Sequence, residues 1–121
     1  MDNTRVEYKA IPEKGIVIAK IGGTSFDAID AFNRKFLSTA TSSLDLNAYA
    51  RDEKFHMPYA FKAVARCHPE DTFDENKGKR VALNKLSDKY NRSLDKHLAN
   101  IMLALDKALK NMDLYFEGRT F

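Results

Sequence analysis

Residues 61–86 read FKAVARCHPEDTFDENKGKRVALNKL, and this stretch decides the fold because a strand, a sharp turn and a helix follow one another in it. Small apolar residues alternate with charged or larger ones over residues 61–68, which is typical of a strand with one buried face. Pro69 ends that strand. Thr72, with Glu75 three residues later, has the pattern of a capping box and predicts that a helix starts here.

Gly78 lies inside this predicted helix, where glycine costs roughly 1 kcal/mol relative to alanine. A close contact with a neighbouring backbone is the usual compensation for that cost. We therefore expect the helix to pack tightly over the alanines of the preceding strand, Ala63 and Ala65.

Upstream of this stretch, the pattern predicts a hairpin and a further helix. Residues 5–11 and 16–21 have strand patterns and are separated by a proline and a glycine that favour a turn. Gly22-Gly23-Thr24-Ser25 stops the second strand, and apolar residues at a 3.6-residue period predict a helix to about Ala40. Residues 41–54 show neither period, and we expect a loop inserted between sheet strands.

Downstream, the pattern predicts that the helix starting at Thr72 breaks or bends at Asn91-Arg92-Ser93, which carries a cap signal. Residues 94–116 form the strongest helical pattern of the chain. Its main apolar row contains Leu98, Ile101, Leu105, Ala108, Met112 and Tyr115, and a second row contains Met102, Leu109 and Phe116. Because this surface is wider than one helix contact requires, we expect a homodimer or higher homo-oligomer. Its contacts are expected at Leu98, Ile101, Leu105 and Met112.

These elements together predict one α+β domain over residues 1–121. An N-terminal antiparallel sheet of about three strands occupies residues 1–67, with the helix and loop of residues 24–54 inserted. Two C-terminal helices follow within residues 72–117, the last one amphipathic and oligomer-forming. A chain of 121 residues with 44% hydrophobic residues is long enough for one core.

The composition predicts a cytoplasmic protein. No apolar run approaches the roughly 18 residues of a membrane span, and the N-terminal residues lack a signal-peptide pattern. The single cysteine, Cys67, excludes an intrachain disulfide and favours a reducing compartment. Lys and Arg number 20 against 17 Asp and Glu, a net charge of +3. This balance is compatible with a small anionic ligand and is weaker than expected for a dedicated nucleic-acid binder.

Lys77, Arg80 and Asn84 are spaced i, i+3 and i+7 and so lie along one side of the predicted helix. Arginine offers forked donors to phosphate and lysine a point charge, while asparagine and an aromatic ring can read the edge and face of a base. The sequence therefore predicts a ligand-binding site that contains Arg66, Lys77, Arg80, Asn84, Lys85 and Phe61. An ordinary solvated helix face is the alternative interpretation of the same stripe.

No other cluster predicts chemistry. Neighbouring strand side chains point to opposite faces, so Cys67 and His68 cannot pair as nucleophile and base, and we expect Cys67 in the core. The histidines and Cys67 lack metal-ligand spacing. The acidic residues at the helix start match its dipole, with a divalent-cation site as the alternative. Gly22-Gly23-Thr24-Ser25 fits a helix cap, with a phosphate-binding turn as the alternative. We expect no catalytic set, metal or cofactor.

The stretch around Cys67 resembles a module of small proteins from bacteriophages and prophages of Gram-positive bacteria. The matching residues are Cys67, Pro69, Asp71, Phe73, Asp74, Gly78 and Ala82. Among such proteins the chain resembles the Thoeris anti-defence sponges in size and in having an N-terminal sheet followed by helices. This resemblance implies non-catalytic sequestration of a cyclic ADP-ribose-type signal at a site between protomers, in the cytoplasm of the host cell.

The leading hypothesis is thus a phage-type counter-defence protein that binds and sequesters a small cyclic nucleotide-derived signal. One alternative is a nucleic-acid-binding module, because a three-stranded sheet followed by a helix is similar to double-stranded-RNA-binding layouts. Another is an inhibitor of a host protein that uses the apolar surface of residues 94–116. An enzyme ranks last, because no nucleophile, base and orienting partner can be assembled from the sequence.

Overall fold

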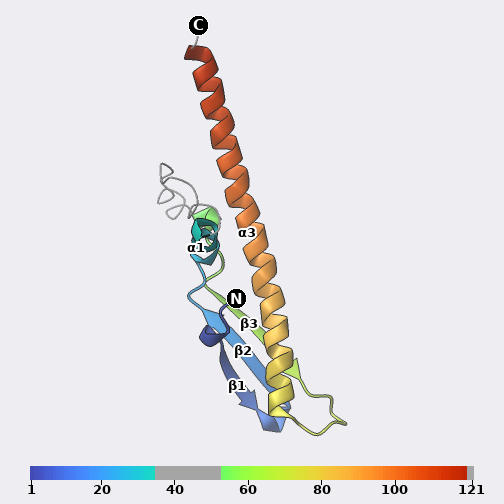
Figure 1. Ribbon diagram of the computed structural model, residues 1–121. Coiled ribbons are helices and arrows are strands. Elements are labelled where there is room, and N and C mark those ends of the chain that lie inside the picture. The colour runs from blue at the N-terminus through green and yellow to red at the C-terminus, as the bar shows by residue number, and fades with distance from the viewer. Residues whose placement is uncertain (35–52, 120–121) are drawn as a thin grey trace. The chain divides into compact units, whose positions relative to one another are not determined.

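The computed structural model describes residues 1–34 and 53–119, with side chains described as far as residue 111 (Figure 1). The predicted helix end near Ala40 and most of the predicted loop at 41–54 lie outside these residues. Contacts divide the chain into two compact units. The sheet unit contains Met1–Ser25 and Met57–Leu94, and the helical unit contains Phe26–His56 and Asp95–Phe121.

The sheet unit contains a three-stranded antiparallel sheet with strand order β1-β2-β3, as predicted. Its strands are β1 (Glu7–Ile11), β2 (Ile16–Gly22) and β3 (Ala60–Arg66). A short 3-10 helix, η2 (Pro12–Lys14), and Gly15 connect β1 to β2. Gly15 has a φ of 62°, a left-handed conformation that favours glycine. The hairpin predicted from the turn residues is therefore confirmed.

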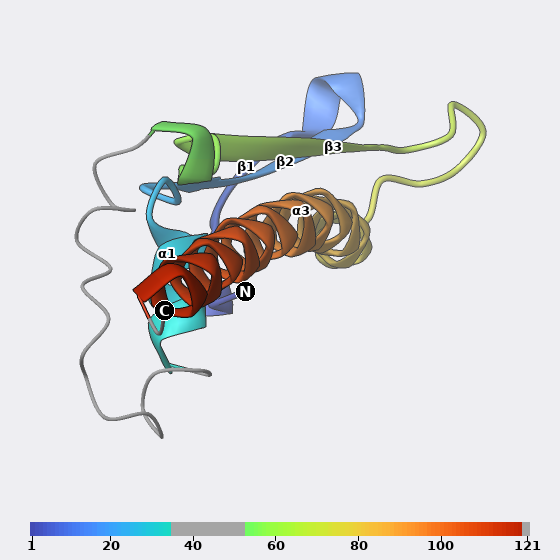
Figure 2. The same cartoon turned by 90° about the horizontal axis from the view of Figure 1, so that it is seen from above.

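The core of the sheet unit lies between one face of the sheet and the first half of the long helix α3 (Glu75–Arg119) (Figure 2). The sheet contributes mostly small side chains, which let the helix come close. The buried cluster consists of Val17, Ala19, Ile21, Ala63, Ala65, Ala82 and Leu86. Partly buried apolar side chains, Phe61 and Phe73 among them, pack around it.

Gly78 makes the predicted close approach, but to a different partner. A Cβ atom on Gly78 would lie 2.6 Å from Cγ2 of Val17, in the central strand β2, rather than against the alanines of β3. No side chain fits at that distance without movement of Val17. The glycine is therefore a requirement of helix packing on the sheet.

Two predictions about this helix are wrong. It begins at Glu75, and its N-terminal cap is Asp74, whose Oδ1 accepts a hydrogen bond from the backbone N–H of Lys77 at 3.2 Å. Thr72 is therefore not the cap. The second error is the predicted break at residues 91–93, because α3 is one continuous helix there. Asn91 is exposed to solvent, while Tyr90 is buried and Leu94 half-buried, so the apolar face continues across the polar residues.

The helical unit contains the short helix α1 (Asp27–Phe32), the 3-10 helix η4 (Glu53–Phe55) and the second half of α3. Within this unit α1 lies beside α3 (Figure 1). Its buried apolar side chains come from all three elements and are Ala28, Ile29, Ala31, Phe32, Phe55 and Ile101. None of the helices described contains a stretch long and apolar enough to span a membrane.

Candidate functional site

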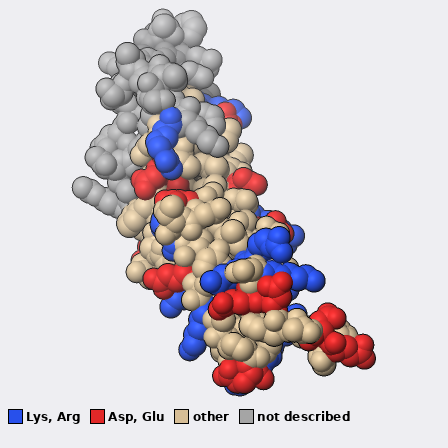
Figure 3. Space-filling model, turned by 60° about the horizontal axis from the view of Figure 1, so that its bottom comes forward, with Lys and Arg blue, Asp and Glu red and all other residues tan. Residues whose placement is uncertain are grey.

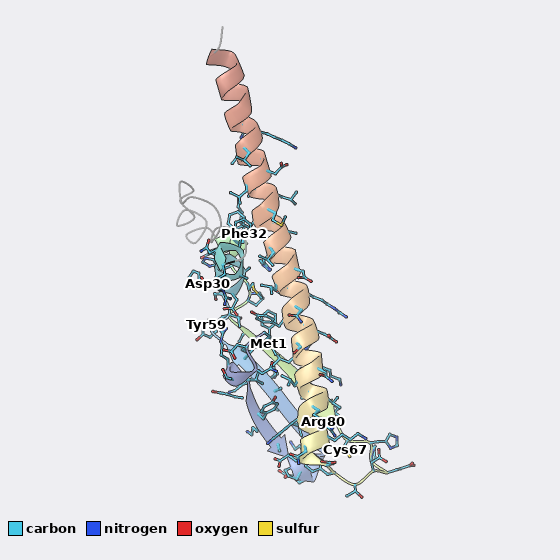
Figure 4. The ribbon with its side chains drawn as sticks, in the orientation of Figure 1. Met1, Asp30, Phe32, Tyr59, Cys67 and Arg80 are labelled. Atoms are coloured by element: carbon cyan, nitrogen blue, oxygen red, sulfur yellow. The ribbon has the colours of Figure 1, made fainter. Side chains whose placement is uncertain are left out.

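A pocket of about 220 Å³ lies in the sheet unit, where the end of β3 meets the first turns of α3. Figure 4 shows Cys67 beside the start of α3. The walls come from the β1–β2 connection, β2, β3, the β3–α3 loop and α3. They are formed by Gly15, Val17, Ala65, Arg66, Cys67, His68, Asp71, Thr72, Phe73, Asp74, Lys77, Gly78 and Val81.

Backbone contacts hold the strand side of this pocket together. The N–H of Cys67 donates to the carbonyl oxygen of Gly15 at 2.7 Å. A Cβ atom on Gly15 would lie 3.2 Å from Cβ of Cys67, so the turn and the end of β3 are in tight contact. Asp74 forms the helix side by capping the first turn of α3 through the N–H of Lys77. The pocket is thus bounded by ordered backbone on two sides.

The pocket combines cationic, acidic and apolar groups. Arg66 and Lys77 are the cationic residues of its lining, and Asp71 and Asp74 are the acidic ones. Phe73 is half-buried at the wall. On the face drawn in Figure 3, Lys and Arg are likewise interleaved with Asp and Glu. A ligand here meets both hydrogen-bond donors to an anion and acceptors for hydroxyl or amino groups.

Two of the six predicted binding residues, Arg66 and Lys77, line this pocket. The structure places the other four elsewhere. Arg80 and Asn84 are exposed on α3 outside the pocket. Both are out of phase with the buried Ala82 and Leu86 and therefore on the solvent side of the helix. The predicted stripe thus does not form one continuous site.

Lys85 and Phe61 have structural contacts instead. The Nζ of Lys85 donates to the carbonyl oxygen of Val64 at 3.2 Å, and the Nζ of Lys89 donates to that of Lys62 at 2.8 Å. Both carbonyls belong to β3, an edge strand of the sheet. Phe61 packs against the core and lies edge to face with Tyr90, with ring centroids 5.8 Å apart. A base cannot stack on the ring face that packs into the core.

Sequence reasoning missed the apolar wall of the pocket, Phe73 and Val81. Phe73 lies in a loop without strand or helix periodicity, and Val81 begins an apolar run of α3 that reads as core, so neither periodicity nor charge marked them as pocket residues. Pro69 was the signal that could have placed Phe73 near the pocket. A turn directly after β3 returns the next few residues toward the end of that strand.

Cys67 is half-buried at the pocket wall rather than within the core as predicted. Its Sγ contacts the carbonyl oxygens of His68 at 3.5 Å and Asp71 at 3.6 Å. The Nδ1 of His68 accepts a hydrogen bond from the N–H of Glu70 at 3.3 Å. The thiol and the imidazole thus both contact backbone groups.

The segment Gly22-Gly23-Thr24-Ser25 connects structural elements. The N–H of Thr24 donates to the carbonyl oxygen of Tyr59 at 3.0 Å, and its buried hydroxyl donates to that of Pro58. Arg5 Nη2 donates to the carbonyl oxygens of Gly22 and Gly23 at 3.0 and 2.8 Å. Thr24, which a phosphate-binding turn would use as a donor, is already bonded, and α1 begins only at Asp27 without a side-chain cap.

Within residues 1–34 and 53–111, no three His, Cys, Asp or Glu side chains are close enough to hold a metal ion. Comparison with known proteins adds no relative: no family model, no curated protein and no solved structure matches this chain.

Proposed function

We propose that this chain is a non-enzymatic binding protein that sequesters a small nucleotide-derived anion in the host cytoplasm, as its resemblance to the Thoeris anti-defence sponges implies. The observation that supports this function best is the position of Arg66 and Lys77 at one pocket with an apolar wall. The guanidinium of Arg66 offers paired donors to a phosphate group, and the ammonium of Lys77 adds a second positive charge.

The size of the pocket limits what it holds. Small-molecule sites usually measure about 300–1,000 Å³, whereas this pocket measures about 220 Å³. It therefore accommodates one phosphate with the adjoining sugar or base, and the rest of a cyclic dinucleotide-sized ligand lies outside it. Phe73 and Val81 offer the apolar surface that the sugar or the base contacts.

The two carboxylates at the pocket favour a nucleotide over inorganic phosphate. Asp74 already accepts a hydrogen bond from the backbone N–H of Lys77, whereas Asp71 adds an acidic group that repels a bare dianion. Ribose hydroxyls and base amino groups can donate to such carboxylates, which inorganic phosphate cannot do to the same extent. A ligand with donors beside its phosphate thus satisfies both kinds of group.

The test is binding of cyclic ADP-ribose-type signals, mononucleotides and inorganic phosphate, followed by mass spectrometry of whatever heating releases. Release of unchanged ligand is the expected result. Arg66→Ala and Lys77→Ala should each weaken binding roughly 10- to 100-fold, because each removes a charge-assisted hydrogen bond. Their thermal unfolding should stay close to wild type, since both side chains lie at the surface of the pocket.

Arg80→Ala is the matched control, because it removes an equal charge from α3 outside the pocket and should leave affinity unchanged. Equal losses for Arg80→Ala and Arg66→Ala, or a chemically altered product, would contradict the proposal. Salt-sensitive binding of duplex RNA in place of nucleotides would support the nucleic-acid alternative instead.

A further inference from the structure

The oligomer contacts predicted on α3 are available only in part. Ile101 is 1% exposed. The prediction that Ile101 contacts another copy is therefore wrong, because this side chain is already buried within the protomer. Leu98 and Leu105 are half-buried, and Met112 lies outside the described side chains, so a contact through them stays a prediction. The sheet unit, by contrast, is described in full, so the partners of its two edges can be compared.

The two edges of the sheet differ in their backbone partners. The strand order leaves β1 and β3 at the edges (Figure 1). On β3, the carbonyl oxygens of Val64 and Lys62 accept hydrogen bonds from the ammonium groups of Lys85 and Lys89. A strand added there would have to displace both lysines. The edge of β3 is thus blocked at two points by side chains of α3.

The pairing pattern shows which backbone groups of β1 face outward. The N–H of Cys67 donates to the carbonyl oxygen of Gly15, so the odd-numbered residues of β2 bond to β3. The even-numbered residues of β2 bond to Glu7, Lys9 and Ile11. The residues that alternate with these three direct their N–H and carbonyl groups away from the sheet.

Val6, Tyr8 and Ala10 are these outward residues. The N–H of Val6 donates to the carbonyl oxygen of Asn3 at 3.2 Å. Among the described residues, none forms a hydrogen bond with the outward backbone groups of Tyr8 or Ala10. Tyr8 is also 38% exposed. These backbone groups are therefore available to an added strand.

The charges of β1 are complementary in one register of self-pairing. In an antiparallel pair centred on Tyr8, Glu7 lies opposite the partner's Lys9, and Lys9 lies opposite the partner's Glu7. Centring the pair on Glu7 or on Lys9 would place that residue opposite its own copy, and a parallel in-register pair would do so for both. Like charges in the Tyr8-centred pair are diagonal neighbours, roughly 7–8 Å apart and farther than the opposite pairs. Charge complementarity thus favours a second copy of this strand and fixes its register.

The side-chain contacts within the protomer are compatible with this pair. Oε2 of Glu7 lies 3.5 Å from Nζ of Lys20, but the Glu7 side chain is still 75% exposed and can face the partner's Lys9 as well. No carboxylate among the described residues pairs with Lys9, and the partner's Glu7 supplies one. Nζ of Lys79 lies over the Tyr8 ring, 5.7 Å from its centroid, and pairing of the backbones leaves this contact in place.

We propose that two copies of this chain join through β1, antiparallel and centred on Tyr8, into one sheet with three strands from each copy. Tyr8 exchanges N–H to carbonyl hydrogen bonds with the partner's Tyr8, and the N–H of Ala10 donates to the carbonyl oxygen of the partner's Val6. The proposal is independent of the ligand at the pocket. Sedimentation of the wild-type protein should show a dimer at high micromolar concentration, and a monomer there would overturn the proposal.

Reversal of single charges tests the register. Glu7→Lys and Lys9→Glu should each raise the dissociation constant at least about 10-fold, because each sets like charges opposite one another at both symmetric positions of the dimer. An equimolar mixture of the two variants should associate again, since each charge then faces its opposite. Lys62→Glu is the matched control, because it reverses a lysine on the same face of the sheet but on β3, and it should leave the dimer intact. Equal weakening by Lys62→Glu, or no recovery in the mixture, would overturn the proposal.

Amide hydrogen exchange followed by NMR locates the interface. The amides of Tyr8 and Ala10 should be protected in the wild-type dimer and exchange freely in the Glu7→Lys monomer. The amide of Lys9, which bonds to β2, should stay protected in both and so shows that the sheet is folded. A dimer whose Tyr8 amide exchanges freely would place the interface elsewhere. A protected Tyr8 amide in a wild-type monomer would show that a segment of the same chain pairs with β1. Either result would overturn the proposal.

Discussion

The two halves of α3 differ in how their apolar residues are spaced. In the first half, Gly78, Ala82, Leu86 and Tyr90 follow at intervals of four, and Ala82 and Leu86 pack with the mostly small side chains of the sheet. In the second half, Leu98, Met102, Leu105 and Leu109 follow at intervals of four, three and four residues. The described residues of that unit contain no sheet. One continuous helix therefore carries two different apolar spacings, and the first of them is matched to the sheet.

The lysines of the two halves differ as well. Lys85 and Lys89 donate to backbone carbonyls of β3, and four residues of helix rise about as far as two residues of strand, so both bonds form together. In the second half, Lys110 pairs with Asp106 at 3.0 Å, one turn away on the same helix. Tertiary contacts thus order the first pair, whereas local contacts order the second.

Of these substitutions, truncation of Leu86 should lower the free energy of unfolding most. Leu86→Ala leaves a cavity in the core between sheet and helix and should cost about 2–5 kcal/mol in the free energy of unfolding. Leu103→Ala removes the same atoms from a side chain 67% exposed and should change stability by less than about 0.5 kcal/mol. Urea titration of both variants measures the difference, and similar losses would contradict the assignment of Leu86 to the core.

Gly78→Ala should have an intermediate effect that depends on Val17. Overpacking against this stiff β-branched side chain costs roughly 1–3 kcal/mol, more than the roughly 1 kcal/mol that alanine adds in helix propensity. In a Val17→Ala background the space opens, and the same substitution should be neutral or stabilising. A double-mutant cycle by urea unfolding measures this coupling. Gly78→Ala with the same effect in both backgrounds would show that the close contact does not limit stability.

The smallest effect concerns the lysines. Lys89→Ala should cost about 0.5–1 kcal/mol, because it frees a carbonyl of β3, while Lys110→Ala should cost about 0.3–0.5 kcal/mol, as expected for a pair on one helix. Thermal unfolding of both variants at low and high salt distinguishes the hydrogen bond of Lys89 from the ion pair of Lys110. The Lys110 effect should fade with salt, and a larger loss for Lys110→Ala than for Lys89→Ala would reverse the distinction.

The sheet was predictable because its signals are local. The alternation in β1, β2 and β3 and the turn at Gly15 depend on neighbouring residues only, and the structure confirms the order of the strands. The continuity of α3 was not predictable from Asn91-Arg92-Ser93, since polar residues that favour a cap are equally stable on the exposed side of a packed helix. Tertiary packing decided between these two outcomes.

The candidate site was predictable only in part for the same reason. The helix period places Lys77, Arg80 and Asn84 on one side, but it does not say where the end of β3 or the β3–α3 loop will lie. That loop supplies Phe73, and the strand supplies Arg66. The helix period also could not predict that Ile101 is buried while Met102 is exposed. Both are apolar, and packing within the helical unit decides which of them is buried.

The connection between β2 and β3 has a kinetic consequence. β1 and β2 are joined by a short turn, whereas residues 23–59 separate β2 from β3. Closing the short loop is fast, while the β2–β3 pairing waits on a long closure that is slower and entropically more costly. The first hairpin can therefore assemble before the β2–β3 pairing, and the pocket, which needs Gly15, Arg66 and Lys77 together, forms only after that pairing. The proposed binding capacity thus depends on closure of the longest connection in the sheet.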